Sequence, residues 1–171
     1  YTVTQTGDST GTLQIYVTLT GYDVYDTTRR LTRSTLTDDT TTYDTVLVQT
    51  KANLSVIHVN TALDSVSRGQ SGKDSATVTV EVRNTGEAEA TITTDTLTFL
   101  KSASSGAALT DSFFVIRKSS GQPSKIAGGA SETWTYVVSV NDSATTGTTV
   151  IEATFSGTDT NSGLTTTDTR A

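Results

Sequence analysis

The stretch Gly147-Thr-Thr-Val-Ile-Glu-Ala-Thr-Phe-Ser-Gly-Thr-Asp159 decides the interpretation of the chain, because it has a counterpart near the beginning. Residues 11–23 read Gly-Thr-Leu-Gln-Ile-Tyr-Val-Thr-Leu-Thr-Gly-Tyr-Asp, and six positions of the two stretches are identical without a gap. Further on, Asp26-Thr-Thr-Arg29 resembles residues 167–170. Internal repeats constrain an architecture more strongly than single elements do. We therefore predict that the N-terminal strands are a partial repeat of the last ones, or an arm that exchanges strands with a neighbour.

The N-terminal copy has the pattern of a half-buried strand. Apolar side chains alternate with polar ones from Leu13 to Thr20, which is the period of two that a strand with one covered face shows. Two or three strands cannot cover such a face by themselves. Either the rest of this chain covers the face, or a neighbouring chain or a preceding repeat does, and we favour an interface with another subunit or repeat. The tyrosines of this segment either join that interface or fill cross-strand positions. The interface candidates are Leu13, Ile15, Tyr16, Val17, Leu19, Tyr22 and Tyr25.

The chain divides by pattern into two parts. Residues 26–42 are polar and are predicted to form a linker or an extended arm, so residues 1–51 are assigned to N-terminal strands and arm. Residues 52–171 are assigned to a complete domain. Short alternating runs separated by Gly, Ser and Asn turns, without a helical pattern, predict an all-β antiparallel sandwich of two sheets. An up-and-down barrel is the second choice.

Two segments of the complete domain make the prediction specific. From Trp134 to Val140 every second residue is apolar, which places Trp134 on the face that lines the core. Between Ala88 and Leu100 the apolar residues change from one face to the other, with Ile92 on one side of the change and Leu97 and Phe99 on the other. A change of this kind inside one strand predicts a β-bulge or a strand that switches sheets.

Composition limits the possible partners. The 171 residues include no cysteine, and the formal net charge is −6, which disfavours nucleic acid and anionic membranes as partners. No apolar run reaches the ~18 residues of a membrane span. The chain begins with Tyr1, so we expect it to be processed or to be a segment of something longer.

Residues 52–171 resemble the immunoglobulin-like modules of bacterial and archaeal surface proteins, most closely the cell-adhesion-related (CARDB-type) family. The resemblance is carried by Ala52-Asn-Leu-Ser-Val, by residues 75–81 running into Val82-Arg-Asn-Thr-Gly86, and by Ala127-Gly-Gly-Ala-Ser-Glu-Thr-Trp134. It implies an immunoglobulin-like fold and a location outside the cell or at its surface. Modules of this family act as spacers, adhesive units or filament subunits rather than as enzymes.

The sequence offers little catalytic or metal-binding chemistry. His58 is the single histidine and lies in a strand pattern, so a structural role is favoured over that of a catalytic base. Acidic loops at Asp38-Asp39, at Asn141-Asp142 and at Asp159 with Asn161 are candidate calcium sites, but these residue types are also ordinary turn formers. Asn53 and Asn141 each begin an N-glycosylation sequon, and glycans are therefore possible partners.

These observations predict a non-enzymatic structural subunit of an extracellular filament, pilus-like fibre or surface stalk. Assembly would proceed through inter-subunit strand contacts or tandem repeats, with copies of the chain as partners. The alternative is an adhesive or carbohydrate-binding accessory module of a secreted or surface protein. That alternative requires an exposed aromatic platform or a pocket at the loop end.

Overall fold

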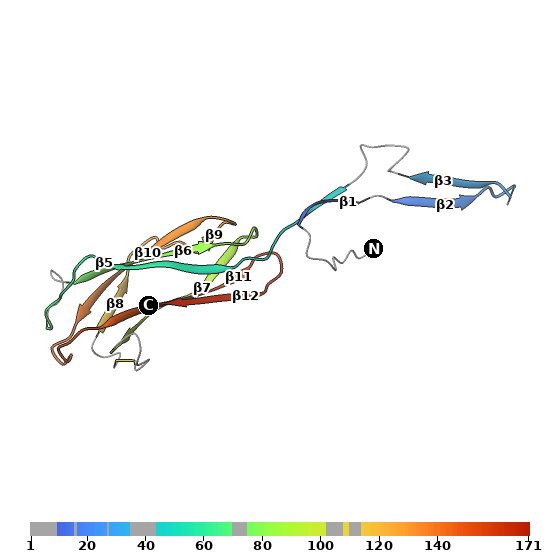
Figure 1. Cartoon of the computed structure of the whole chain (residues 1–171). Coiled ribbons are helices and arrows are strands. Elements are labelled where there is room, and N and C mark those ends of the chain that lie inside the picture. The colour runs from blue at the N-terminus through green and yellow to red at the C-terminus, as the bar shows by residue number, and fades with distance from the viewer. Residues whose placement is uncertain are drawn as a thin grey trace. The chain divides into compact units, whose positions relative to one another are not determined.

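The chain forms two compact units, unit 1 from Tyr1 to Thr50 and unit 2 from Lys51 to Ala171. The computed structural model describes residues 10–15, 17–26, 28–34, 44–69, 75–101, 108–109 and 114–171, and within them all regular structure is strand (Figure 1). The strands of unit 1 are β1 (Gly11–Ile15), β2 (Thr18–Tyr22), β3 (Arg30–Ser34) and β4 (Asp44–Val48). The strands of unit 2 are β5 (Leu54–Thr61), β6 (Ala76–Asn84), β7 (Ala90–Leu100), β8 (Phe114–Lys118), β9 (Lys125–Ile126), β10 (Ser131–Val140), β11 (Val150–Asp159) and β12 (Thr165–Arg170).

Unit 2 consists of two antiparallel sheets that share one core. The strand orders are β5-β6-β10-β8 in one sheet and β12-β11-β7-β9 in the other. Along β6 and β10 alternate side chains are buried, as the sequence pattern predicts for strands covered on one face. The apolar side chains of both sheets meet in a single cluster. The predicted all-β antiparallel sandwich is therefore confirmed.

Trp134 lies at the centre of this core. Its side chain has no exposed surface, and its ring meets that of Phe155 edge-on at 4.8 Å between ring centroids. Trp134 belongs to β10 and Phe155 to β11, so the contact joins the two sheets. The position of Trp134 on the inward face, predicted from the alternation of β10, is confirmed.

Two β-bulges adjust the sandwich. In β7, Ile92 is paired with Gly157 and Thr94 with Ser156, so Thr93 is the extra residue, and the predicted change of face is confirmed. A second bulge lies in β5, where Val56 pairs with Val82 and His58 with Glu81. The sequence pattern of β5 did not predict this bulge, because apolar residues stand on both of its faces.

The Asn84-Thr-Gly86 turn connects the residues just before β5 with the backbone near β7 and β9 through hydrogen bonds of the Asn84 side chain. The buried Asn84 amide donates to the carbonyl oxygens of Ala88 and Ile126, at 2.7 and 3.2 Å. Its Oδ1 accepts from the backbone N–H groups of Asn53 and Gly86, at 3.0 and 3.1 Å. A Cβ on Gly86 would stand 2.0 Å from the carbonyl oxygen of Lys51, so only glycine permits this approach. A fully bonded side chain of this kind stabilises a turn in which Asn84 and Gly86 are buried and Thr85 is exposed.

Unit 1 is a ribbon of paired strands. β1 pairs with β4 and β2 with β3, both antiparallel. The single strand predicted from Leu13 to Thr20 is therefore two strands with different partners. The prediction that residues 26–42 form a linker or arm was wrong for Arg30–Ser34, which is β3. A strand of a two-stranded ribbon needs no apolar face, so the polar sequence gave no signal. The strand expected at residues 1–6 lies outside the described residues.

Replacing Trp134 by Ala is expected to lower the free energy of unfolding of unit 2 by ~3–5 kcal/mol, through lost apolar burial and the cavity left behind. The measurement is the urea midpoint followed by far-UV circular dichroism. Tyr25→Ala serves as the control, because this side chain is 98% exposed and its loss should change stability by less than about 0.5 kcal/mol. Equal midpoints for the two variants would contradict the central position of Trp134.

Candidate functional site

Most of the described apolar side chains of unit 1 are exposed, whereas Ile15 and Val48 are half-buried. No residue of unit 1 whose exposure the structure describes is buried, and Leu13, Val17 and Leu19 are 43%, 46% and 64% exposed. On the return strands Val46, opposite Leu13, and Leu31, opposite Gly21, are exposed as well. A two-stranded ribbon with an apolar face is marginally stable in water unless something covers that face. This apolar ribbon surface, defined by Leu13, Ile15, Val17 and Leu19, is the candidate functional site of the molecule.

The predicted interface tyrosines do not gather on this surface. Tyr22 ends β2 and is separated from Leu19 and Gly21 by the alternation of the strand, and Tyr25 projects from the tip of the hairpin. Tyr16 lies outside the described residues. The tip itself is held by Asp23, whose Oδ1 accepts the backbone N–H of Tyr25 at 2.9 Å, and by Asp26, whose Oδ1 accepts the backbone N–H of Thr28 at 3.1 Å. Hydrogen bonds from Thr28 lower the pKa of Asp26.

Unit 2 contains a matching acidic residue, Asp159, that is buried. Its Oδ2 accepts the backbone N–H of Ala52 at 2.6 Å, and its Oδ1 accepts those of Asn161 and Ser162 at 2.8 and 2.7 Å. Burial alone would raise the pKa of Asp159, but these backbone hydrogen bonds outweigh it and the pKa is lowered. The carboxylate therefore joins the first residues of the sandwich to its last hairpin.

The seam between β5 and β12 continues from this carboxylate. The backbone N–H of Leu54 donates to Thr166 Oγ1 at 3.1 Å, and that of Val56 donates to Asp168 Oδ2 at 2.7 Å. The Arg170 guanidinium donates to the carbonyl oxygen of Val56 at 3.4 Å. Side chains of β12 thus satisfy main-chain groups at the edge of β5, where another strand could otherwise bind.

At the opposite side of the sandwich, a polar cluster links the two sheets. The Lys118 ammonium of β8 pairs with Asp95 of β7, and the Tyr136 hydroxyl donates to the second oxygen of Asp95 at 3.3 Å. Burial raises the pKa of Tyr136, and the neighbouring Asp95 carboxylate raises it further. These contacts are those of a structural link.

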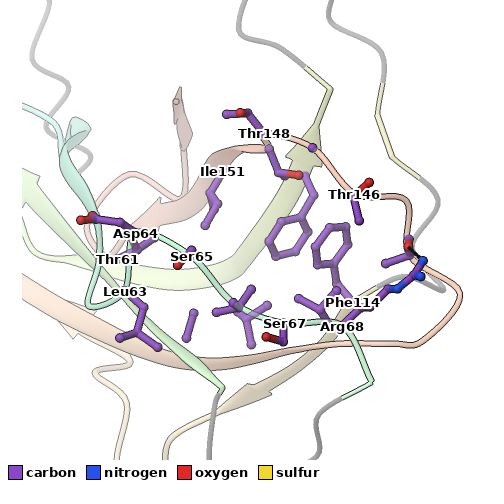
Figure 2. A pocket seen from close by; sticks show the side chains of 18 of the residues that line it. Thr61, Leu63, Asp64, Ser65, Ser67, Arg68, Phe114, Thr146, Thr148 and Ile151 are labelled. Atoms are coloured by element: carbon purple, nitrogen blue, oxygen red, sulfur yellow. Dashed lines mark hydrogen bonds between the residues drawn. The ribbon is translucent and has the colours of Figure 1, made fainter.

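A pocket of about 680 Å³ opens at one end of the sandwich (Figure 2). Ile151 and Phe114 point into it, and Thr146 and Thr148 stand on the loop that borders it. The rings of Phe114 and Phe99 stack on each other at 3.9 Å. The Arg68 guanidinium donates to the carbonyl oxygen of Ala144 at 3.3 Å. The lining of the pocket therefore combines apolar side chains that belong to the core or pack against it with Thr, Ser, Asp and Arg side chains.

The candidate residues for glycosylation, catalysis and calcium binding lie at separate places in the structure. Asn53 is exposed just before β5, and its amide donates to Thr85 Oγ1 at 2.8 Å. Asn141 is half-buried in the turn after β10. His58 is exposed on β5 beside Glu81. Asp38 and Asp39 lie outside the described residues. Within the described ranges no three His, Asp or Glu side chains gather as metal ligands would, and both oxygens of Asp159 accept backbone hydrogen bonds.

Neither the protein-family models nor the curated proteins with which the chain was compared match it. In the described part of the chain, no helix is long and apolar enough to cross a membrane. Sequence reasoning identified the apolar ribbon surface but missed the part played by Asp23 and Asp159. The signal was available, because the two aspartates occupy the same position of the two repeated stretches.

Replacing Asp159 by Asn is expected to lower the free energy of unfolding of unit 2 at neutral pH by ~1.5–3 kcal/mol, since charge-assisted hydrogen bonds are lost. A lowered folded pKa stabilises the fold above the unfolded value of about 3.9 and loses that contribution as the pH falls through the folded pKa. The difference between wild type and Asp159→Asn should therefore be constant from pH 7 to 5 and shrink below about pH 4. Urea unfolding at a series of pH values measures this difference, and a gap that stays constant down to pH 2 would contradict the assignment.

Proposed function

We propose that this chain is a non-enzymatic structural element of an extracellular filament, fibre or surface stalk, assembled through strand contacts between repeated units. One observation carries the proposal: the described part of unit 1 is a ribbon without a core that exposes the side chains of Leu13, Val17 and Leu19. Such a surface is stabilised when a partner covers it. Unit 2, in contrast, has an apolar core of its own.

The strand order of unit 2 supports the immunoglobulin-like part of the proposal. The orders β5-β6-β10-β8 and β12-β11-β7 correspond to the ABED and GFC sheets of constant-type immunoglobulin sandwiches, with β9 as an addition. Together with the Asn84-Thr-Gly86 turn, this order favours the resemblance to CARDB-type surface modules. Fold alone does not specify activity, so the functional proposal rests on the open surface of unit 1.

Composition is consistent with life outside the cell. Because the chain has no cysteine, its fold does not depend on the redox state of its surroundings. Its net charge of −6 favours solubility. Tandem or end-to-end assembly extends a structure along one dimension, because each unit contacts only its neighbours. A contact of this kind between different surfaces does not close on itself and yields an open filament.

Native material is expected to contain filaments, or else a covalent chain much longer than 171 residues. Intact mass spectrometry combined with negative-stain microscopy distinguishes the two. Filaments whose subunits have the mass of one such chain indicate strand exchange between molecules, whereas a far larger mass indicates tandem repeats. A monomer of this size that forms no fibres at high concentration would refute the proposed function.

A further inference from the structure

We propose that residues 11–23 of unit 1, which contain β1 and β2, act together as the closing strand of a second sandwich, and that their partner is a body built like β5–β10 whose place for a β11-type strand is empty. This inference deepens the proposed function by naming the partner. It rests on the repeat between residues 11–23 and 147–159, because the structure shows what covers the second copy.

The two copies have the same backbone at both ends. Gly11 and Gly147, the first residues, have φ angles of 132° and 147°, which favour glycine. At the other end the backbone N–H of Asp23 donates to the carbonyl oxygen of Arg29 at 3.1 Å, and that of Asp159 to Leu164 at 2.9 Å. Both aspartates accept the N–H two residues ahead, from Tyr25 at 2.9 Å and from Asn161 at 2.8 Å. The two hairpins differ by one residue at the tip.

Three apolar positions of the first copy, Ile15, Val17 and Leu19, correspond to residues of the second that lie in the core or pack against it, whereas Leu13 corresponds to the half-buried Thr149. Ala153, Phe155 and Asp159 are buried on the inward face of β11. Their counterparts in the gapless match are Val17, Leu19 and Asp23, and Ile15 matches Ile151. The exchange of Ala and Phe for Val and Leu keeps the apolar character and moves volume from one position to its neighbour, a change that cores tolerate. The first copy is therefore fitted to a core like that of unit 2.

Gly21 is the most specific indication of a partner. In β11 a Cβ on Gly157 would stand 3.0 Å from both the Leu54 side chain and the carbonyl oxygen of Thr91, so β5 and β7 approach the strand closely there. A Cβ on the matching Gly21 would meet nothing within 4 Å among the described residues, and this glycine has no positive φ. Glycine weakens a strand unless another backbone comes close. Gly21 thus leaves space for a partner that approaches as β5 and β7 do.

The partner consequently offers two contacts. A β7-type strand pairs with β2 on the edge opposite β3, as β7 pairs with β11 on the edge opposite β12. The N–H that begins a β5-type strand donates to Asp23 Oδ2, which accepts no hydrogen bond from the described residues, as Ala52 donates to Asp159. Unit 2 itself is not this partner, because β11 occupies the position. The contact of the return strand with a β5-type edge differs between the two copies. Leu31 pairs with Gly21 as Thr166 pairs with Gly157, but Leu31 has no hydroxyl to accept the N–H that Thr166 accepts from Leu54.

The first test exchanges the strands within the full chain. Replacing residues 147–159 by the sequence of residues 11–23, one for one, is expected to give a folded unit 2 with one cooperative unfolding transition. In the matched control, residues 147–159 are replaced by the sequence of residues 12–24. This shifts the alternation by one residue and turns polar side chains inward. The control is expected to lose the transition. A failure of the first chimera to fold, or equal folding of the two, would overturn the proposal.

The second test supplies the partner. A copy of residues 52–146 replaces residues 1–10, so that it runs directly into residue 11. The repeat defines this junction, because residue 147 follows residue 146 in the second copy. Amide hydrogen exchange of residues 11–22 is expected to slow at least a hundredfold, and Gly21→Val is expected to abolish the protection. If the first chimera folds while these amides exchange as fast as in the unextended chain, the strand fits but does not dock, and the inference falls. Filaments or a long covalent chain in native material would still support the proposed function in that case.

Discussion

The buried carboxylate of Asp159 is the interaction on which the sandwich depends. It is 2% exposed, and a charge so placed is tolerated only when hydrogen bonds replace its water. Three backbone N–H groups do so, one from Ala52 and two from the tip of the β11–β12 hairpin. Because Ala52 leads into β5 and the tip leads into β12, the carboxylate aligns the two outermost strands of one side of the sandwich. The contacts of Thr166 and Asp168 with β5 follow from this alignment.

This seam also determines where other chains can add. The edge of β5 is the natural place for a foreign strand, but two of its N–H groups bind side chains of β12. Lys118, Asp95 and Tyr136 link the sheets on the other side. In unit 2, side chains of β12 thus already bind main-chain N–H groups at the edge of β5. Unit 1, in contrast, exposes an apolar face. The difference between the two units, rather than a cleft or a cluster of reactive groups, is what identifies the candidate functional surface.

Alternation made most of unit 2 predictable from the sequence. Val78 to Val82 and Trp134 to Val140 have one apolar face each, and the change of face in β7 marked its bulge. β3 was not predictable, because a ribbon strand exposed on both sides carries no periodic signal. The roles of Asn84 and Asp159 depend on backbone groups that are distant in sequence, so their residue types indicated turns and nothing more. The alternation from Leu13 to Thr20 indicated an apolar face that two or three strands cannot cover, and Leu13, Val17 and Leu19 are exposed; their place in an interface stays a prediction.

The two repeated stretches, residues 11–23 and 147–159, share the positions that face a core, whereas their return strands differ. Gly21 and Asp23 keep the two features through which β11 fits a body, namely close approach of a neighbouring backbone and a carboxylate for its first N–H. The return strand does not keep the side chains that bind the edge of β5, since Leu31 replaces Thr166. A strand that enters a core must match its shape, whereas a seam at the surface can be closed by several side-chain types. The pattern of agreement is therefore that of two closing strands built for the same core and for different seams.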